Sequence, residues 1–416
     1  MEHEELITGI DLGSSKVSVA IGNYQDGEFN IRGYGISESP GVRGGVVVDL
    51  QEQAKCIGDV VRKAESQAGE EVSSVFVGIS GQHIRLTTKE GRISIPGTYE
   101  EISIQQTREV IAHARSEPES LGMDVIHVLP SQFILDGSEG IKNPVGLFGR
   151  ELRAKVTTIT ALTTATQNII RCMNMAGLEV EDVILSTLAT GEVLLYPEEK
   201  DLGVGLIDIG GQLTDIAVFK GEAPVYFSSI PYGGENLTRD IATNFHISLK
   251  EAERIKKEHA VALRYLLEEN HQIEVRSESS SGYRERKIGS LELAEITEKK
   301  CEMIISHILK RIEKFFPYLG SGIVLTGGTS LLPGLKEMME EEADLPVRIG
   351  RMAKNVIRGP GERSRESSST LPYLTCIGLV ALGERTRRKE EIYPWERETF
   401  YDKTIGKFIN WIRGFF

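Results

Sequence analysis

The chain has 416 residues, of which 40% are hydrophobic and 26% are charged, and it carries a formal net charge of −13. Because hydrophobic cores stop growing at roughly 250–300 residues, this length predicts more than one domain. The acidic balance disfavours a dedicated nucleic-acid binder, which would present a basic surface. Four cysteines lie far apart without a CxxC pair, which favours reduced thiols over a metal site or a disulfide.

The start of the chain is acidic and runs directly into an apolar segment, so it lacks the pattern of a secretory signal. No apolar run approaches the ~18–20 residues that a membrane-spanning helix needs. These features predict a protein that stays on the cytoplasmic side.

The first informative element is a hairpin at residues 10–17, with the sequence IDLGSSKV. Asp11 ends an apolar strand, a Gly/Ser turn follows, and a β-branched strand begins at Val17. Such a turn exposes backbone N–H groups with no side chain in the way, so it suits a phosphate. The carboxylate of Asp11 suits Mg²⁺, which prefers oxygen ligands and keeps several waters.

The next elements are a strand at 29–35, a glycine-rich loop at 41–49, an amphipathic helix at 50–69 and a buried strand at 72–80. Strands that alternate with helices predict an α/β fold with a mixed sheet. Between residues 82 and 166, strand-like segments surround one helix at about 103–117. This pattern predicts a small inserted α+β subdomain, with either an interaction role or a purely supporting one.

A helix of small apolar residues is expected at 182–195, before a second hairpin at 207–215 with the sequence IDIGGQLTD. Asp208 again ends an apolar strand, and Gly210 and Gly211 lead into the strand at 216–219. Two such turns facing each other would hold one nucleotide polyphosphate from both sides. The pair therefore carries more information than either turn alone.

Residues 247–316 are expected to be mostly helical, with an exposed turn at 277–282. An apolar strand at 323–326 then leads to Gly327 and Gly328, with a helix starting near Leu332. These glycines allow the backbone to lie flat against a base or a ribose. A polar loop is expected at 358–370 and a second small-residue helix at 371–383.

This order of elements resembles the actin/Hsp70/sugar-kinase ATPase superfamily, where they are two phosphate motifs, an adenosine motif and two connecting helices. The resemblance covers residues 6–385 and is closest to the bacterial cell-division family FtsA. Four features carry this resemblance: the early insertion, the loop GVRGGVVVD at 41–49, and the runs PSQFILD at 130–136 and GIKNPVGLFG at 140–149. It implies an actin-like two-lobed ATPase fold of the α/β class, with duplicated RNase H-like mixed sheets.

The resemblance also implies domain boundaries. The first-lobe core takes residues 1–81 and 167–196, and the inserted subdomain takes 82–166. The second-lobe core takes 197–245 and 320–385, and a helical second-lobe subdomain takes 246–319. A charged linker at 386–402 would lead to an amphipathic membrane-targeting helix at 403–416.

ATP and Mg²⁺ are the ligands that the resemblance implies, with Asp11 and Asp208 holding Mg²⁺ largely through water. The expected nucleotide contacts are Gly13, Ser14, Ser15, Lys16, Gly210, Gly211 and Gln212 at the phosphates, Gly233, Gly234 and Glu235 at the ribose, and Glu253, Lys256, Lys257, Gly327, Gly328 and Thr329 beside the adenosine. For Glu253 and Lys257, an i,i+4 surface ion pair is the alternative.

Hydrolysing relatives carry a Gln or Glu near the start of the first connecting helix, where it positions the attacking water. The corresponding stretch here, STLATG at 186–191, has neither residue before Glu192. Because positioning dominates phosphoryl transfer, we expect slow hydrolysis at most and assign no catalytic residue.

The last fourteen residues, KTIGKFINWIRGFF at 403–416, form an amphipathic pattern at helical spacing. Basic and polar residues lie opposite an apolar face made of Ile405, Phe408, Ile409, Trp411, Ile412, Phe415 and Phe416. Such a helix lies in a membrane interface rather than spanning the bilayer. A helix docked on the protein's own core is the alternative.

The leading hypothesis is a peripheral protein on the cytoplasmic side of the cell membrane at the division septum. It would bind membrane lipids through its tail, assemble with itself as actin-like protofilaments, tether the C-terminal peptide of the tubulin-like protein FtsZ and recruit later divisome proteins, without nucleic acid. The alternative is a PilM-like cytoplasmic scaffold of pilus assembly, which normally lacks such a tail. A sugar or acetate kinase is disfavoured, because it would need a catalytic Asp and a sugar-binding cleft in the first lobe, and no candidate base is found there. An Hsp70-type chaperone is also disfavoured, because it would need a substrate-binding domain after residue 385.

Overall fold

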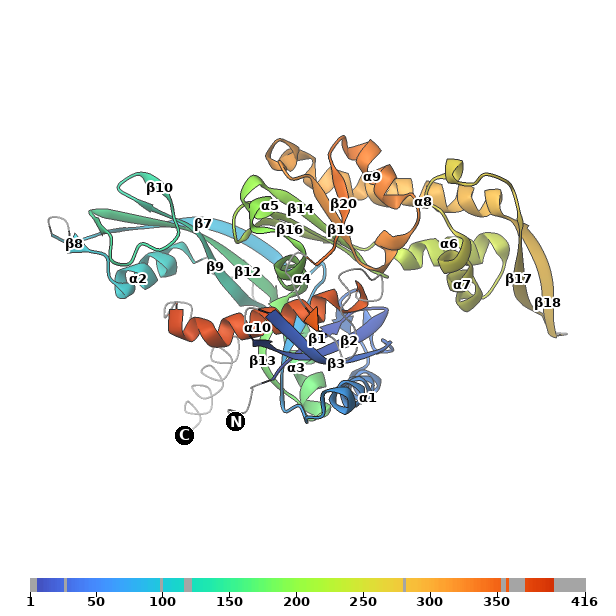
Figure 1. Ribbon diagram of the computed structural model, residues 1–416, viewed down its shortest axis with the longest axis horizontal. Coiled ribbons are helices and arrows are strands. Elements are labelled where there is room, and N and C mark those ends of the chain that lie inside the picture. The colour runs from blue at the N-terminus through green and yellow to red at the C-terminus, as the bar shows by residue number, and fades with distance from the viewer. Residues whose placement is uncertain are drawn as a thin grey trace.

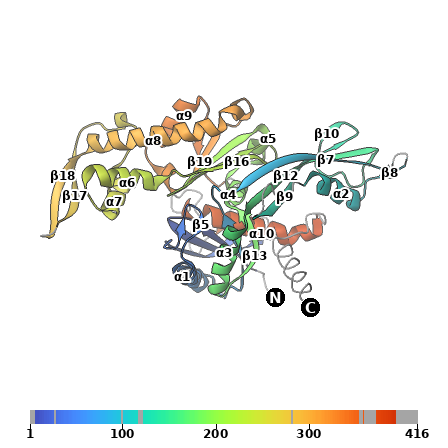
Figure 2. The same cartoon turned by 180° about the vertical axis from the view of Figure 1, so that it is seen from behind.

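A computed structural model describes residues 6–25, 28–97, 100–115, 122–279, 282–352, 357–358 and 371–392. Two mixed β-sheets form the centre of the molecule, and we call the parts built on them the first and the second lobe (Figure 1). The inserted subdomain lies at one end and a long hairpin of the second lobe at the opposite end, as Figure 2 also shows from behind.

The first-lobe sheet has the strand order β13–β6–β1–β2–β3–β21. Its strands are β1 (Ile7–Leu12), β2 (Lys16–Gln25), β3 (Glu28–Glu38), β6 (Ser74–Ile79), β13 (Glu179–Leu185) and β21 (Ile357–Arg358). Strands β1 to β3 form an antiparallel meander, whereas β6 and β13 run parallel to β1. Ile10 and Val19 are fully buried in this sheet, since helices pack on both of its faces.

The second-lobe sheet repeats this arrangement with the strand order β16–β15–β14–β19–β20. Its strands are β14 (Val204–Ile209), β15 (Thr214–Phe219), β16 (Pro224–Ile230), β19 (Ile323–Thr326) and β20 (Val347–Ile349). Here too an antiparallel meander is extended by two parallel strands. The duplicated mixed sheets that the resemblance implies are therefore present.

The short hairpin of β4 (Val42–Arg43) and β5 (Val46–Val47) precedes helix α1 (Leu50–Ala68). The Asp49 carboxylate accepts hydrogen bonds from the N–H groups of Gln51 and Glu52, which caps the helix start. Gly69 ends the helix in the left-handed conformation, with a φ of 76°. These signals explain why the predicted bounds of 50–69 agree with the structure.

The inserted subdomain is an antiparallel sheet of order β10–β9–β12–β7 with one helix against it. Its elements are β7 (Arg85–Ser94), β8 (Glu100–Glu101), α2 (Ile104–Ala114), β9 (Met123–Leu135), β10 (Ser138–Ile141), β11 (Phe148–Gly149) and β12 (Glu151–Leu162). Ser103 and Gln106 form a capping box at the start of α2, and Val110 on its inner face is fully buried. Helix α3 (Thr163–Met175) then returns the chain to the first lobe.

Helices and 3-10 turns surround the second-lobe sheet and extend beyond it toward the long hairpin (Figure 1). The elements are α5 (Pro197–Leu202), α6 (Gly234–Phe245), α7 (Leu249–His259), α8 (Ser290–Ile312), α9 (Leu335–Ala343) and the 3-10 turns η1 (Arg264–Leu266), η2 (Glu313–Tyr318) and η3 (Gly328–Leu331). The prediction of a mostly helical stretch at 247–316 is wrong in part, because β17 (Gln272–Ser279) and β18 (Gly282–Gly289) form a hairpin inside it. Ile273, Val275 and Ile288 bury one face of that hairpin. The helix expected near Leu332 begins at Leu335.

Two connecting helices, α4 (Ser186–Leu194) and α10 (Leu374–Ile392), join the lobes, with the turn η4 (Leu371–Tyr373) before α10. Residues 182–185, predicted as the start of the first of these helices, instead complete β13, because Val183 and Ile184 pair with β6 and are buried there. Residues 386–392, predicted as linker, continue α10. Arg387 holds this end of the helix to the first lobe through an ion pair with Glu181 at 2.5 Å. The predicted tail residues lie outside the described part of the chain.

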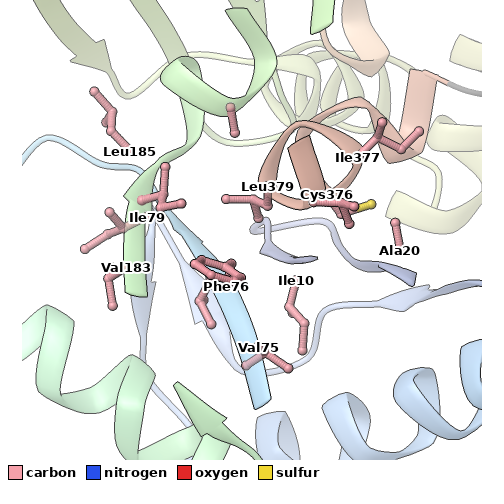
Figure 3. Close-up of a cluster of buried hydrophobic side chains, with 14 of the residues drawn as sticks. Ile10, Ala20, Val75, Phe76, Ile79, Val183, Leu185, Cys376, Ile377 and Leu379 are labelled. Carbon is pink, nitrogen blue, oxygen red and sulfur yellow. The ribbon is translucent and has the colours of Figure 1, made fainter. Parts of the chain in front are cut away.

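Helices α4 and α10 pack closely against each other. A Cβ atom on Gly378 of α10 would lie 1.9 Å from the backbone oxygen of Ala189 on α4, so only glycine permits this approach. Figure 3 shows Cys376 and Leu379 of α10 directed toward the first-lobe strands that carry Ile10, Ala20 and Phe76. The first-lobe core therefore extends directly into the helix pair between the lobes.

No helix in the described ranges is long and apolar enough to span a membrane. All four cysteines are buried and free, in agreement with the expectation of reduced thiols.

A buried ionic network joins the helix pair to the second lobe. Lys200 of α5 is 7% exposed, and its Nζ lies 3.5 Å from a carboxylate oxygen of Glu192 and 3.9 Å from one of Glu222. Arg385 of α10 lies 3.6 Å from the same Glu192 oxygen. Since Lys200 has little access to water, these partners compensate for the hydration that its ammonium group loses.

We expect Lys200→Met to lower the free energy of unfolding by about 3 kcal/mol, because it leaves the largely buried carboxylate of Glu192 short of a partner. Urea denaturation of the purified chain measures this loss. The double variant Glu192→Leu/Lys200→Met removes both charges and should recover most of it. Equal losses in the single and the double variant would contradict the role assigned to the network.

Candidate functional site

The two glycine turns expected to hold a phosphate meet between the lobes. A Cβ atom on Gly211, in the β14–β15 turn, would lie 1.7 Å from the hydroxyl oxygen of Ser15 in the β1–β2 turn. The second turn is closed by the Gly210 N–H, which donates to the Leu213 carbonyl at 2.9 Å. Lys16 follows the first turn, and its Nζ donates to the Pro372 carbonyl at 2.8 Å. The backbone turns of the two lobes therefore meet where Gly211 approaches Ser15.

Three carboxylates lie beneath these turns. Asp11 ends β1, Asp208 lies near the end of β14, and Asp215 stands directly opposite Asp208 on β15. Burial raises the pKa of Asp11 to about 6, although Lys16 opposes this and Asp215 adds to it. Burial also raises the pKa of Asp208 to about 7, and repulsion from Asp215 and Asp11 contributes. The three negative charges therefore lie close enough to destabilise one another.

Asp215 also links the lobes. The hydroxyl of Ser80, in the loop after β6 of the first lobe, donates to Asp215 Oδ2. The other carboxylate oxygen, Oδ1, is buried and has no hydrogen-bond partner among the described residues. Burial raises the pKa of this group as well, and the hydroxyls of Ser229 and Ser80 counteract part of that effect. An unpartnered buried carboxylate oxygen is costly unless a ligand or a cation completes it.

This donor set fits a hydrated divalent cation. Mg²⁺ binds through one or two carboxylates and retains several waters. A cation would relieve the repulsion that raises the pKa values of Asp11 and Asp208. Within the described ranges, no three His, Cys, Asp or Glu side chains are placed to ligate one metal ion together.

A second group of predicted residues surrounds the start of α6. Thr329 Oγ1 donates to the Gly210 carbonyl at 2.9 Å, which brings the third glycine element to the second turn. Lys256, on α7, donates to the Gly234 carbonyl at 3.1 Å and to Thr238 Oγ1 at 2.9 Å. These contacts bring together four segments, namely the β14–β15 turn, the start of α6, α7 and η3.

Glu253, Lys256 and Lys257 differ in their surroundings. Lys256 is largely buried and pairs with Glu253 at 2.6 Å. Lys257 has a side chain that is 71% exposed and forms the i,i+4 pair with Glu253 at 3.2 Å. The surface-pair alternative thus describes Lys257, whereas Lys256 is directed toward Gly234. Although burial alone raises the pKa of Glu253, its hydrogen bonds from Lys256 and Thr238 outweigh this and lower it.

Sequence reasoning assigned no role to Asp215 or Ser80. The sequence did carry a signal for Asp215. Once the two strands of the hairpin and the short turn between them are assigned, residues 208 and 215 fall opposite each other on one face. Ser80 follows a buried strand without any motif of its own, and only the tertiary structure brings it to Asp215. Glu192, the first carboxylate of α4, is held by Lys200 and Arg385.

Comparison with known proteins identifies the family. A family model described as "Cell division protein FtsA" matches residues 205–375, and one described as "SHS2 domain inserted in FTSA" matches residues 81–160. The cell division protein FtsA of Pseudomonas aeruginosa is 34% identical over 387 residues, which cover 91% of this chain and 89% of that protein. The chain belongs to the FtsA family. Escherichia coli K12 FtsA is 33% identical over 423 residues and 98% of both chains, and Bacillus subtilis FtsA is 31% identical over 93% of this chain and 86% of that protein.

Solved structures place the FtsA-family chain in the actin-like fold. A chain of the PilM–PilN type IV pilus biogenesis complex superposes with a TM-score of 0.65 at 16% identity, covering 92% of this chain and 99% of that one. MreB5 of Spiroplasma citri bound to ADP gives a TM-score of 0.56 at 14% identity, covering 93% and 98%. The expectation of an actin-like fold is confirmed. Likeness to the pilus complex is one of fold alone, so the pilus alternative is not favoured.

Proposed function

We propose that this FtsA-family chain binds Mg²⁺–ATP between its lobes and acts as an actin-like scaffold of cell division. The observation that carries the proposal is the meeting of two glycine turns from different lobes above Asp11, Asp208 and Asp215. Backbone N–H groups at such turns bind phosphate oxygens, and the carboxylates bind a hydrated cation. Curated relatives named cell division protein FtsA, similar over nearly their whole length, support the cellular role.

The predicted residues receive roles in this proposal, with Glu253 holding Lys256 in place through their ion pair. The turns at Gly13–Lys16 and Gly210–Gln212 bind the phosphates, and Asp11 and Asp208 hold Mg²⁺ through water. Gly233, Gly234 and Glu235 approach the ribose, while Lys256 and the Gly327–Thr329 segment lie beside the adenosine. Mg²⁺ neutralises phosphate charge when it is bound. Lys257, with its largely exposed side chain, contributes little.

Hydrolysis is proposed to be slow. The start of α4 offers no free amide or carboxylate, because Glu192 is paired with Lys200 and Arg385. Asp215, which lies opposite Asp208 and has no assigned Mg²⁺ role, is the remaining group that could accept a proton from a water. Nucleotide therefore acts mainly as a ligand for assembly, with turnover limited by poor positioning of the water.

The finer cellular role rests on the family and on the tail. The proposal places the chain at the inner face of the cell membrane at the division septum, held by the apolar face of residues 403–416. It tethers the C-terminal peptide of FtsZ and recruits later divisome proteins while assembling with itself. Basic residues opposite Trp and Phe favour an interfacial helix in this segment.

Liposome co-sedimentation tests this role with the full chain and with a truncation before Asp402, in the presence of ATP and FtsZ. The full chain is expected to pellet with liposomes that contain anionic lipid and to bring FtsZ with it. Truncation should remove most of both effects, because it deletes the apolar face. Equal pelleting of the two forms would refute the tether, and a full chain that pellets without FtsZ would refute the assignment to division.

A further inference from the structure

Strand β3 is the outer strand of the first-lobe sheet along most of its length. Its outer neighbour, β21, pairs only with Phe29 and Asn30, so the later part of β3 has no partner strand on that side within the described ranges. At this edge lies a groove of about 740 Å³, lined by β3, α1 and Tyr373. None of its lining residues is among the predicted nucleotide contacts. The groove is therefore a separate feature of the first lobe.

The backbone in the groove is arranged to pair with a further strand. The Gln67 side chain of α1 accepts from the Tyr34 N–H at 3.1 Å and donates to the Tyr34 carbonyl at 3.0 Å, as a neighbouring strand would. Since the N–H and C=O groups of alternate residues in a strand point to the same side, those of Ile36 also face away from β2. No described residue forms a hydrogen bond with either group. Ile36 therefore offers a backbone donor and acceptor at the spacing of a β ladder.

The two walls of the groove differ in chemistry. On one face of β3, glycine allows α1 to lie against the strand, because a Cβ atom on Gly35 would be 2.2 Å from the Val60 carbonyl oxygen. This contact brings the polar outer side of α1, including Lys63, to the edge of the sheet. On the other face, Tyr34 packs against Tyr373 with the ring centroids 4.8 Å apart. One wall is therefore polar and the other is aromatic.

Lys63 gives the polar wall a positive charge. Arg62 forms an ion pair with Asp59, whereas Lys63 is exposed and forms no ion pair with a described carboxylate. The chain as a whole carries a net charge of −13, so this local excess of positive charge runs against its overall balance. A ligand that fits the groove should place a negative charge beside Lys63 and apolar groups beside the two tyrosines.

We propose that the edge of β3 binds an extended acidic segment of a partner protein, which adds a strand to the first-lobe sheet in line with β21. The backbone of that segment pairs with the N–H and C=O groups of Ile36. Because successive side chains of a strand point to opposite faces, its apolar residues lie against Tyr34 and Tyr373 while its carboxylates lie beside Lys63. A pattern of alternating apolar and acidic residues is therefore the chemistry that this edge recognises.

Fluorescence anisotropy of a labelled peptide of alternating Val and Glu residues, titrated with the full chain, tests the proposal. The same peptide with Lys in place of Glu should bind about tenfold more weakly, because it brings like charge to Lys63. A version with proline at its centre should also lose most of its affinity, because proline cannot donate to the ladder.

Two substitutions separate the contributions of charge and backbone. Lys63→Glu should weaken the Val/Glu peptide about tenfold and strengthen the Val/Lys peptide, a reversal that loss of folding cannot produce. Ile36→Pro removes the outward N–H, is compatible with an edge strand, and should weaken the Val/Glu peptide about threefold to tenfold. Lys55→Glu, at an exposed position of α1 outside the groove, is the matched control and should leave both affinities unchanged.

Equal affinity for the Val/Glu and Val/Lys peptides, or no binding of either at millimolar concentration, would overturn the proposal. An unchanged affinity in Lys63→Glu would overturn it as well. Binding that appears only after residues 359–370 are replaced by a short Gly/Ser linker would assign the groove to this chain itself and not to a partner. These outcomes do not depend on nucleotide, since the groove shares no residue with the predicted nucleotide contacts.

Discussion

Asp208→Asn is expected to stabilise the ligand-free protein at pH 8 and to weaken binding of Mg²⁺–nucleotide by 10-fold to 100-fold. Both effects come from one buried charge. Repulsion and burial raise the pKa of Asp208 from 3.8 to about 7, so the ionised carboxylate opposes folding at pH 8. Removing it should stabilise the fold by roughly 2–4 kcal/mol, since one pKa unit corresponds to about 1.4 kcal/mol. The loss of affinity is typical for a residue that orients a metal ion.

The pH dependence follows from the direction of the shift. A carboxylate whose pKa is raised on folding binds its proton more tightly in the folded state than in the unfolded state. Its contribution to stability is therefore complete below about pH 3.8 and is lost as the pH rises through about 6 for Asp11 and about 7 for Asp208. The advantage of Asp208→Asn should be largest at pH 8 and should shrink steadily toward pH 5, vanishing only below about pH 3.8, where both the folded and the unfolded states are protonated.

Urea denaturation at pH 5, 6, 7 and 8, without Mg²⁺ or nucleotide, measures this trend. Asp201→Asn, at an exposed position on α5, is the matched control and should change stability by less than about 0.5 kcal/mol. A stabilisation that is constant across this pH range would contradict the assignment of a raised pKa to Asp208. Nucleotide titrations at pH 8 measure the loss of affinity separately.

Gly378→Ala is expected to destabilise the protein by about 3 kcal/mol or more, although alanine normally favours helices. The added methyl group would lie 1.9 Å from the Ala189 carbonyl oxygen, and neither backbone can yield without separating α4 from α10. Overpacking of this kind costs typically 1–3 kcal/mol and more where the neighbour is backbone. Because these helices join the lobes, nucleotide affinity should fall as well.

Gly58→Ala provides the matched control for this substitution. Gly58 lies inside α1, and the nearest atom to an added Cβ is the end of the Arg62 side chain at 3.3 Å, which can move. Replacement there should stabilise the protein by about 0.5–1 kcal/mol through helix propensity. Thermal and urea denaturation of both variants should therefore give changes of opposite sign. A neutral effect of Gly378→Ala would contradict the close helix contact.

Local patterns explain why much of the fold could be predicted from the sequence. Strands, turns and caps near Asp11, Asp49 and Asp208 lie within short segments, so the sequence alone identifies both hairpins and helix α1. The β17–β18 hairpin was missed because its strands carry many charges, and among the side chains that the structure describes there, Ile273, Val275 and Ile288 mark the buried face. At 182–185, pairing with β6 overrides a small-residue pattern that favours helix.

In the candidate site, too, local motifs predicted some residues, whereas others are brought in only by the tertiary structure. Asp11 and Asp208 follow from motifs, whereas Ser80 and Gly44 reach the site from loops that are distant in sequence from the residues they contact. Distinguishing Lys256 from Lys257 required the orientation of α7 relative to α6. A motif specifies which residue types are present, and the packing of the lobes decides which of them meet.

The continuation of α10 to Ile392 limits how far the folded body can move from any surface that holds residues 403–416. Ten residues, 393–402, separate the two segments, and even a fully extended chain of that length reaches only about 35 Å. Because Arg387 forms an ion pair with Glu181 near this end of α10, the ten-residue connection begins at the first lobe. A bilayer holding the tail would therefore keep the end of α10, and with it the first lobe, within about 35 Å of its surface. Any rotation of the second lobe about the helix pair would then change the angle at which a filament of such subunits faces the membrane.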